Sequence, residues 1–227
     1  LRGFNQEGGK VTGTIENLEV ISLQNKSTTT GSSSGISAGI SSSGIPNSIG
    51  LDRSSTDGER AYVDNQSTFI IGEGSNLSVG KAANTGAVIG TEGSGVLKIN
   101  EYTGKNLNNY DTMRTTGGSI GLQTGNVPIS NIGYSQDSKD KEGVARNTVI
   151  GNVEIGTSTG AAINRDLSKA NETTRDDHSS TNINVESQTI EYAVNPGKLK
   201  EDIGKAKQEI ADVTRAFKES VNDRGDD

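Results

Sequence analysis

Short apolar strings recur along the first two thirds of the chain, each three to six residues long and bounded by glycine, asparagine or aspartate. Within residues 18–23 and 96–99 apolar and polar positions alternate, so one side of each string is apolar. Alternation with a period of two in segments this short predicts β-strands joined by tight turns. The other strings of this kind are residues 11–15, 77–79, 87–89 and 153–155.

Three stretches lack such strings. Residues 28–43, which are rich in serine, and residues 134–142 have too little apolar surface to offset the entropy of ordering, so both are expected to be loops. Ile36, Ile40 and Ile45 could anchor the first of these loops. After residue 156 the composition shifts, and residues 157–194 are predicted to be a polar connector with one short alternating strand at 182–190.

The last part of the chain has a helical pattern. Asn195 and Pro196 form a helix start signal, with asparagine as N-cap and proline at the first helical position. Apolar residues then recur at alternating spacings of four and three, which predicts an amphipathic helix over residues 195–222 and a tail over 223–227. The helix would pack against the β part or pair with a partner, and packing is favoured. Its apolar seam is Leu199, Ile203, Ala206, Ile210, Val213, Phe217 and Val221.

An imperfect internal repeat organises the β part. Residues 45–52 are similar to residues 127–135, and residues 67–72 are similar to residues 147–151. Equivalent glycines are Gly50 and Gly133, 83 positions apart, and Gly72 and Gly151, 79 positions apart. The matching order and spacing indicate a duplication, with copies at about residues 1–72 and 73–156.

The composition narrows the fold class. Of 227 residues, 29% are hydrophobic and 4% aromatic, with no tryptophan, so few large side chains are available for a wide core. Disordered chains and β-solenoids both tolerate this composition. Apolar β-branched clusters such as Phe69-Ile70-Ile71 and Val149-Ile150 favour the second. The predicted fold is therefore mainly β: a right-handed parallel β-helix-like solenoid over residues 1–156, then the irregular connector and the α-helix.

Charge and cysteine content limit the partners. The net charge of −7 argues against nucleic acid, because phosphates require a basic surface. The chain has no cysteine, which excludes disulfides and thiolate metal sites. No apolar run approaches the roughly 20 residues of a transmembrane helix, so no transmembrane segment is expected. The chain begins at Leu1 without methionine or a signal peptide, and we expect it to be part of a longer protein.

The search for catalytic chemistry identifies no catalytic, cofactor-binding or metal-ligating residues. His178 is the only histidine and is expected in a polar loop, and no second histidine could share a metal. The glycine-rich strings at residues 72–75 and 93–95 lack the Lys-Ser/Thr ending of a phosphate loop, so they are interpreted as turns. Arg224, Gly225 and Asp226 form a tripeptide that some adhesins use to engage integrins, although three residues in a charged tail also occur by chance. An enzyme is not expected, and no cofactor.

The order of several strings is similar to that in one known group of proteins. These strings are LSVG at 77–80, TGAVIG at 85–90, VLKI at 96–99, KNLNNY at 105–110, IGYS at 132–135, GVARNTVIG at 143–151 and INRDL at 163–167. In this order they resemble the repeats of filamentous-haemagglutinin-like exoproteins of two-partner secretion. The downstream strings are similar to the end of the haemagglutinin repeat region in exoproteins of contact-dependent growth inhibition. The likeness covers most of residues 10–215.

The resemblance implies export by an outer-membrane two-partner transporter and a secreted or cell-surface location on a Gram-negative bacterium. It implies a structural segment, without catalysis, that presents or helps deliver a C-terminal toxin domain to neighbouring cells during competition between bacteria. The alternative is an adhesin segment, a virulence trait, that binds a target-cell receptor, a host surface or a biofilm. Further hypotheses are a polysaccharide-active β-helix enzyme and a toxic effector at residues 157–227. The Val-Glu-Asn-Asn boundary of the pretoxin region is absent, and no catalytic residue of the family carries over.

Overall fold

A computed structural model describes residues 1–44, 46–123 and 129–186, together with single residues at 197, 204, 208, 211, 212 and 215. This described part is mainly β, as predicted, with thirteen strands and one 3-10 turn, Leu167–Lys169. The chain divides into two units. The coil unit comprises Leu1–Thr28, Glu59–Thr112 and Asp140–Asp177, and the sheet unit comprises Thr29–Gly58, Met113–Lys139 and His178–Asp227.

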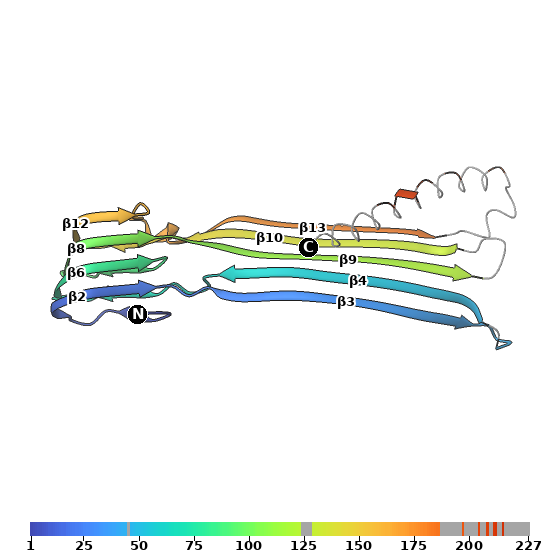
Figure 1. Ribbon diagram of the computed structural model, residues 1–227, viewed down its shortest axis with the longest axis horizontal. Helices are drawn as coiled ribbons and strands as arrows, with labels where there is room; N and C mark the ends of the chain where they lie inside the picture. The colour runs from blue at the N-terminus through green and yellow to red at the C-terminus, as the bar shows by residue number, and fades with distance from the viewer. Residues whose placement is uncertain are drawn as a thin grey trace. The chain divides into compact units, whose positions relative to one another are not determined.

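The coil unit contains two parallel four-stranded sheets. In one, the strand order is β1 (Asn5–Glu7), β5 (Thr68–Ile71), β7 (Val88–Thr91) and β11 (Thr148–Ile150). In the other, the order is β2 (Thr12–Ile21), β6 (Asn76–Thr85), β8 (Val96–Lys105) and β12 (Val153–Gly160), and Figure 1 shows these four side by side. The chain alternates between the sheets, so each pair of successive strands forms one coil of a stack. All the apolar strings identified in the sequence lie on or beside these strands.

Neighbouring coils have a fixed register. Thr68 pairs with Val88 and Asn76 pairs with Val96, so the chain advances 20 residues between the two middle coils, which no hairpin separates. The turns repeat with the same spacing, because the peptide N–H of Ser75 donates to Gly72 and that of Gly95 donates to Glu92. The interpretation of these glycine-rich strings as turns is confirmed. Hairpins are inserted between β2 and β5 and again between β8 and β11.

The long strand of each coil bends at one column of residues. On β6 the buried positions are Leu77 and Val79, then Ala82 and Asn84, so alternation restarts after Gly80. The pairing of β2, β6, β8 and β12 is interrupted at the column of Gly80 in every case. A Cβ at Gly80 would lie 2.7 Å from the carbonyl oxygen of Glu16 on the next coil. Each coil therefore has three straight segments, one from the first sheet and two from the second.

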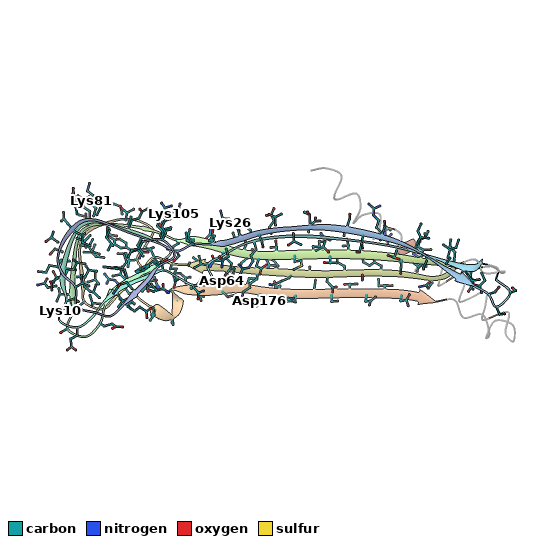
Figure 2. The ribbon with its side chains drawn as sticks, turned by 90° about the horizontal axis from the view of Figure 1, so that it is seen from below. Lys10, Lys26, Asp64, Lys81, Lys105 and Asp176 are labelled. Carbon is teal, nitrogen blue, oxygen red and sulfur yellow. The ribbon has the colours of Figure 1, made fainter. Side chains whose placement is uncertain are left out.

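The interior of the coil unit consists of stacked apolar side chains. Phe69, Ile89 and Val149 occupy equivalent positions in successive coils, as do Leu77 and Leu97. Each is 9% exposed or less. Burial of a side chain of this size contributes about 1.5–3 kcal/mol, so a narrow stack of Val, Ile and Leu replaces the wide aromatic core that the composition excludes. Outward positions are polar, and Lys10 and Lys81 lie on the outside of the unit (Figure 2).

Buried polar side chains satisfy the backbone where the coils turn and where the hairpins depart. The hydroxyl of Tyr102 donates to the Oδ1 of Asn147 at 2.8 Å, and the amide of Asn147 donates to Asn106 at 2.7 Å. Asn84 donates to the carbonyl of Thr148 and accepts from the peptide N–H of Ala87. No buried side-chain nitrogen or oxygen in the described ranges lacks a hydrogen-bond partner. The hydrogen bonds of this network therefore offset the desolvation cost of burying these polar groups.

The sheet unit is built from the strands of the two hairpins and one further strand. The order in this five-stranded sheet is β13 (Asn171–Glu186), β10 (Ile129–Ala145), β9 (Leu107–Gln123), β4 (Pro46–Tyr62) and β3 (Asn25–Ile40). Figure 1 shows these strands side by side. Hydroxyl groups pair across neighbouring strands, including Ser33 with Ser54 at 2.7 Å and Thr56 with Thr115 at 3.1 Å. Ser138 and Ser179 form a similar pair.

Two predicted loops are wrong. The serine-rich residues 28–43 fall mostly on β3, and residues 134–142 lie within β10. The irregular connector is also partly wrong, because residues 182–186 of the expected short strand are the end of β13, which begins at Asn171, and residues 187–190 lie outside the described residues. Serine and threonine stabilise these strands through backbone pairing and through hydroxyl bonds to strands distant in sequence. The prediction relied on the number of apolar residues, which is independent of both backbone pairing and hydroxyl hydrogen bonds.

The internal repeat corresponds to repeated elements. Gly50 lies on β4 and Gly133 on β10, the returning strands of the two hairpins. Gly72 follows β5 and Gly151 follows β11, the first strands after each hairpin. The proposed domain boundaries stay predictions. In the part of the chain that the structure describes there is no helix of seven residues or more, and the helix predicted for residues 195–222, with its seam, lies outside the described residues.

Candidate functional site

One face of the sheet unit has a shallow groove of about 470 Å³. It crosses β4, β9, β10 and β13, and small side chains form its floor. A Cβ at Gly133 would lie 2.5 Å from the hydroxyl of Ser119, and a Cβ at Gly117 would lie 2.8 Å from the hydroxyl of Ser135. The glycines therefore leave the space that the groove occupies. A larger residue at either position would displace the serine opposite.

The side chains around the groove are polar. They include one carboxylate, Asp52, and the amides of Asn131, Asn182 and Asn184, whereas Arg53 borders the groove through its backbone because its side chain lies on the opposite face. Amide and carboxylate groups on a flat floor of glycine and serine can donate to and accept from several hydroxyl groups of one ligand. This chemistry suits a hydroxyl-rich ligand such as a glycan. We call the groove side of the sheet its polar face, represented by Asp52, Ser119, Gly133 and Asn184.

The opposite side of the same sheet is apolar. Because side chains alternate along a strand, the residues next to those of the polar face point the other way. The resulting apolar face consists of Ile36, Ile40, Ile49, Leu51, Ile120, Ile132 and Ile183. Ile36 is 82% exposed and Ile120 is 42% exposed, whereas Ile132 on β10 is 6% exposed. Several exposed isoleucines on one face of a sheet make that face a candidate interaction surface.

A charged cluster in the coil unit surrounds Tyr62. Arg60 contacts Asp64 at 2.5 Å and Asp111 at 3.4 Å, and its guanidinium lies 5.4 Å from the Tyr62 ring. The Nζ of Lys141 lies 4.8 Å from the same ring, over which two cations are therefore held. The hydrogen bond from Arg60, followed by that from Asn25, holds the pKa of Asp64 below its ordinary value. Asp64 is labelled in Figure 2.

This cluster is structural rather than a site of proton transfer. Arg60 is paired with two carboxylates, and Asp64 with both Arg60 and Asn25. The hydroxyl of Tyr62 shares a hydrogen bond with Thr173 on β13 at 2.8 Å. The arrangement links strands β4, β9 and β13 and stabilises their arrangement within the coil unit.

The residues singled out in the sequence are not brought together. His178 is exposed and lies on β13, not in a loop as expected. Nearby, Arg175 forms ion pairs with Asp140 and Asp177, and the pKa of Arg175 is raised mainly by the hydrogen bond to Asp177. The tripeptide Arg224, Gly225 and Asp226 lies outside the described residues. Within the described ranges no group of three or more histidine, aspartate or glutamate side chains is placed to hold a metal ion.

Sequence reasoning missed both faces of the sheet unit. The signal for the apolar face was present in part, because Ile36 and Ile40 share one side of a strand. Ile49 and Leu51 likewise share one side of the next strand. The groove had no comparable signal, since it depends on which serine lies opposite each glycine.

None of the described helical residues belongs to a helix that is long and apolar enough to cross a membrane. No protein-family model, curated protein or solved structure matches the chain.

Proposed function

We propose that the coil unit is a stretch of β-solenoid and that the chain is a structural and delivery segment of a secreted surface exoprotein. The observation that carries the proposal is the in-register parallel pairing of four successive coils in both sheets, with the two middle coils 20 residues apart. Stacked coils of constant length, with in-register apolar columns, are the defining property of solenoid proteins. A right-handed winding is expected, because crossover connections between parallel strands are almost always right-handed.

The end coils support a mechanical role. Val79 and Ile99 in the middle coils are buried, whereas Ile15 on β2 and Ile155 on β12 are partly exposed. Their strands, at the edges of the sheet, pair on one side only. Parallel edges with partly exposed apolar side chains accept further coils of the same kind, so stability can be extended along the stack. Such a stack serves to hold other parts of a protein at a distance.

The hairpins support a role in presentation. Each is inserted between one coil and the next, at equivalent places in the two copies of the repeat. This regular insertion suits a scaffold that exposes a second surface while the coils continue. The similarity to haemagglutinin-like exoproteins adds the proposed setting, which is two-partner secretion and delivery of a C-terminal toxin into neighbouring bacteria.

A deletion in the exoprotein gene of the producing bacterium tests this function. Removing the codons for residues 1–186 should abolish growth inhibition of neighbouring cells in mixed culture while the protein is still displayed at the surface. As a matched control, replacing residues 31–56 by a two-residue turn removes one hairpin and keeps the coils. Unchanged inhibition after the large deletion would refute delivery, provided that surface display is confirmed with an antibody to another part of the protein.

The groove on the polar face favours a second candidate function, adhesion to glycans. Its amide, carboxylate and hydroxyl groups match the hydroxyl groups of a sugar chain. Asn182→Ala should weaken binding of the chain to immobilised glycans, whereas Thr181→Ala, next to it on the opposite face, should leave binding unchanged. Equal binding by both variants would exclude the groove as an adhesion site. Loss of adhesion without loss of growth inhibition would separate the two functions.

A further inference from the structure

The apolar face of the sheet unit consists of a continuous row flanked by further apolar side chains. Contacts between Gly35 and Asp52, Ser55 and Thr116, and Gly133 and Ser119 fix the register of four strands. That register places Ile36, Leu51, Ile120 and Ile132 in one row across β3, β4, β9 and β10. Ile40 and Ile49 lie beyond the row on one side, and Ile183 lies beyond it on the other.

The amphipathic segment at residues 195–222 matches this face in chemistry. Its seam is formed by Leu, Ile, Ala, Val and Phe at helical spacing, and the residues between them are mostly Lys, Glu, Asp and Gln. A helix with one narrow apolar seam requires a complementary apolar surface, because its polar side belongs in water. The sheet offers such a surface of aliphatic side chains, and a helix packed on a sheet face is a common layer arrangement.

The dimensions agree. From Leu199 to Val221 a helix would extend about 33 Å. Strand spacing and rise per residue place Ile40 and Ile183, at opposite corners of the apolar face, about 28 Å apart. A helix lying diagonally across the strands would therefore cover the row and both flanks.

The connection also favours this occupant over a second copy of the chain. Strand β13 contributes Ile183 to the face and ends at Glu186. The chain from Glu186 to Leu199 spans up to about 45 Å when extended, which reaches every part of the face. A tether of this length gives an effective concentration in the millimolar range, above that of a separate chain in solution.

We infer that the apolar face of the sheet unit is the docking surface for residues 195–222 of the same chain. Docking would turn a single-layer sheet into two layers and bury the isoleucines that the strands expose. It would also fix the chain that follows residue 222 to the sheet unit. The inference is independent of the proposed delivery function, since it concerns only how the chain covers its own surface.

Limited proteolysis of the full chain tests the inference. Trypsin cleaves after Lys200, Lys205, Lys207 and Arg215, and a docked helix resists cleavage to the extent that it stays docked. Ile120→Glu places a charge on the apolar face and should accelerate cleavage at these sites about tenfold or more. Gln123→Glu places the same charge on the polar side of the same strand, outside the groove, and should leave the rate unchanged.

A second pair of variants keeps the test valid if Ile120→Glu disturbs the sheet. Ile210→Glu changes the seam itself, and Gln208→Glu changes the opposite side of the predicted helix. The first should accelerate cleavage as Ile120→Glu does, and the second should not. The inference is overturned if the unchanged chain is cleaved as fast as the variants. It is equally overturned if light scattering shows a dimer that Ile120→Glu dissociates, since the face would then bind a second copy.

Discussion

The coil unit and the sheet unit have similarly polar sequences but different sources of stability. In the coil unit inward-pointing positions are two or three residues apart. Apolar columns such as Phe69, Ile89 and Val149 stack from coil to coil. In the sheet unit the strands form one layer, and the apolar side chains Ile36 and Leu51 are exposed. Backbone pairing is common to both units, whereas among the described residues stacked apolar columns are found only in the coil unit. The difference indicates that burial, more than composition, distinguishes them.

The largest expected effect comes from a change in the coil interior. Leu97→Ala removes a fully buried side chain between Leu77 and Val153 and should lower the free energy of unfolding by about 2–5 kcal/mol. Leu51→Ala on the apolar face removes the same atoms from a side chain that is 40% exposed and should cost about 1 kcal/mol or less. Urea denaturation of both variants measures the difference. Equal losses would contradict the distinction between the units.

A smaller effect is expected from the buried amide network. Asn147→Ala leaves the Tyr102 hydroxyl without its acceptor and should destabilise the coil unit by about 1–3 kcal/mol. Asn100→Ala, at an exposed position on β8, is the matched control and should change stability by about 0.5 kcal/mol or less. Urea denaturation of the two variants compares their unfolding free energies. It tests whether buried polar groups, as well as buried apolar groups, stabilise the coil unit. Similar values for the two variants would show that the network adds nothing.

The third prediction concerns alkaline pH. Burial raises the pKa of Tyr102 to about 12. The folded state therefore retains a proton that the unfolded state loses near pH 10, so stability should fall as the pH rises from about 10 to 12. Tyr102→Phe has no proton to lose, and its stability should fall less over the same range. Thermal denaturation at several pH values compares the two, and parallel curves would argue against a buried, neutral tyrosine.

The smallest effect is expected on the outer surface of the coils. Lys81 and Glu101 approach to 3.8 Å with side chains that are 70% and 56% exposed. Such pairs contribute about 0.5 kcal/mol, and less in salt. Lys81→Ala should therefore lower the unfolding free energy by no more than this, and the loss should vanish at about 1 M salt. A loss above 2 kcal/mol would show that charge, not the interior, holds the coils together.

The two units also differ in how far the sequence predicts them. Strands β6 and β8 follow from the alternation in residues 77–79 and 96–99, because apolar positions record which side is buried. The bend at Gly80 is not visible in the sequence alone, since it depends on the carbonyl of Glu16 in the next coil. Strand β3 is missed for a related reason. Its serines are stabilised by β4, and nothing local distinguishes them from a loop.

The candidate sites show the same limit. The apolar face could be inferred once β3 and β4 were known to be strands, because Ile36 and Ile49 then fall on one side. The groove requires the pairing of Gly133 with Ser119, which no single segment specifies. The duplication, in contrast, was visible through Gly50 and Gly133 and corresponds to the two hairpins. Structure formed by residues distant in sequence is thus predictable where the sequence repeats. It is not predictable where it depends on one particular pairing of strands.

Residue-level hydrogen exchange of the full chain tests most directly the claim that the coils form one stable, continuously stacked unit. The amides of β5, β6, β7 and β8 should be protected together, with opening free energies close to that of global unfolding. Amides of β3 and β4 within residues 31–54 should exchange faster, through local opening of a single-layer sheet. Rapid exchange in β6 and β8, or equal protection in both units, would contradict the account.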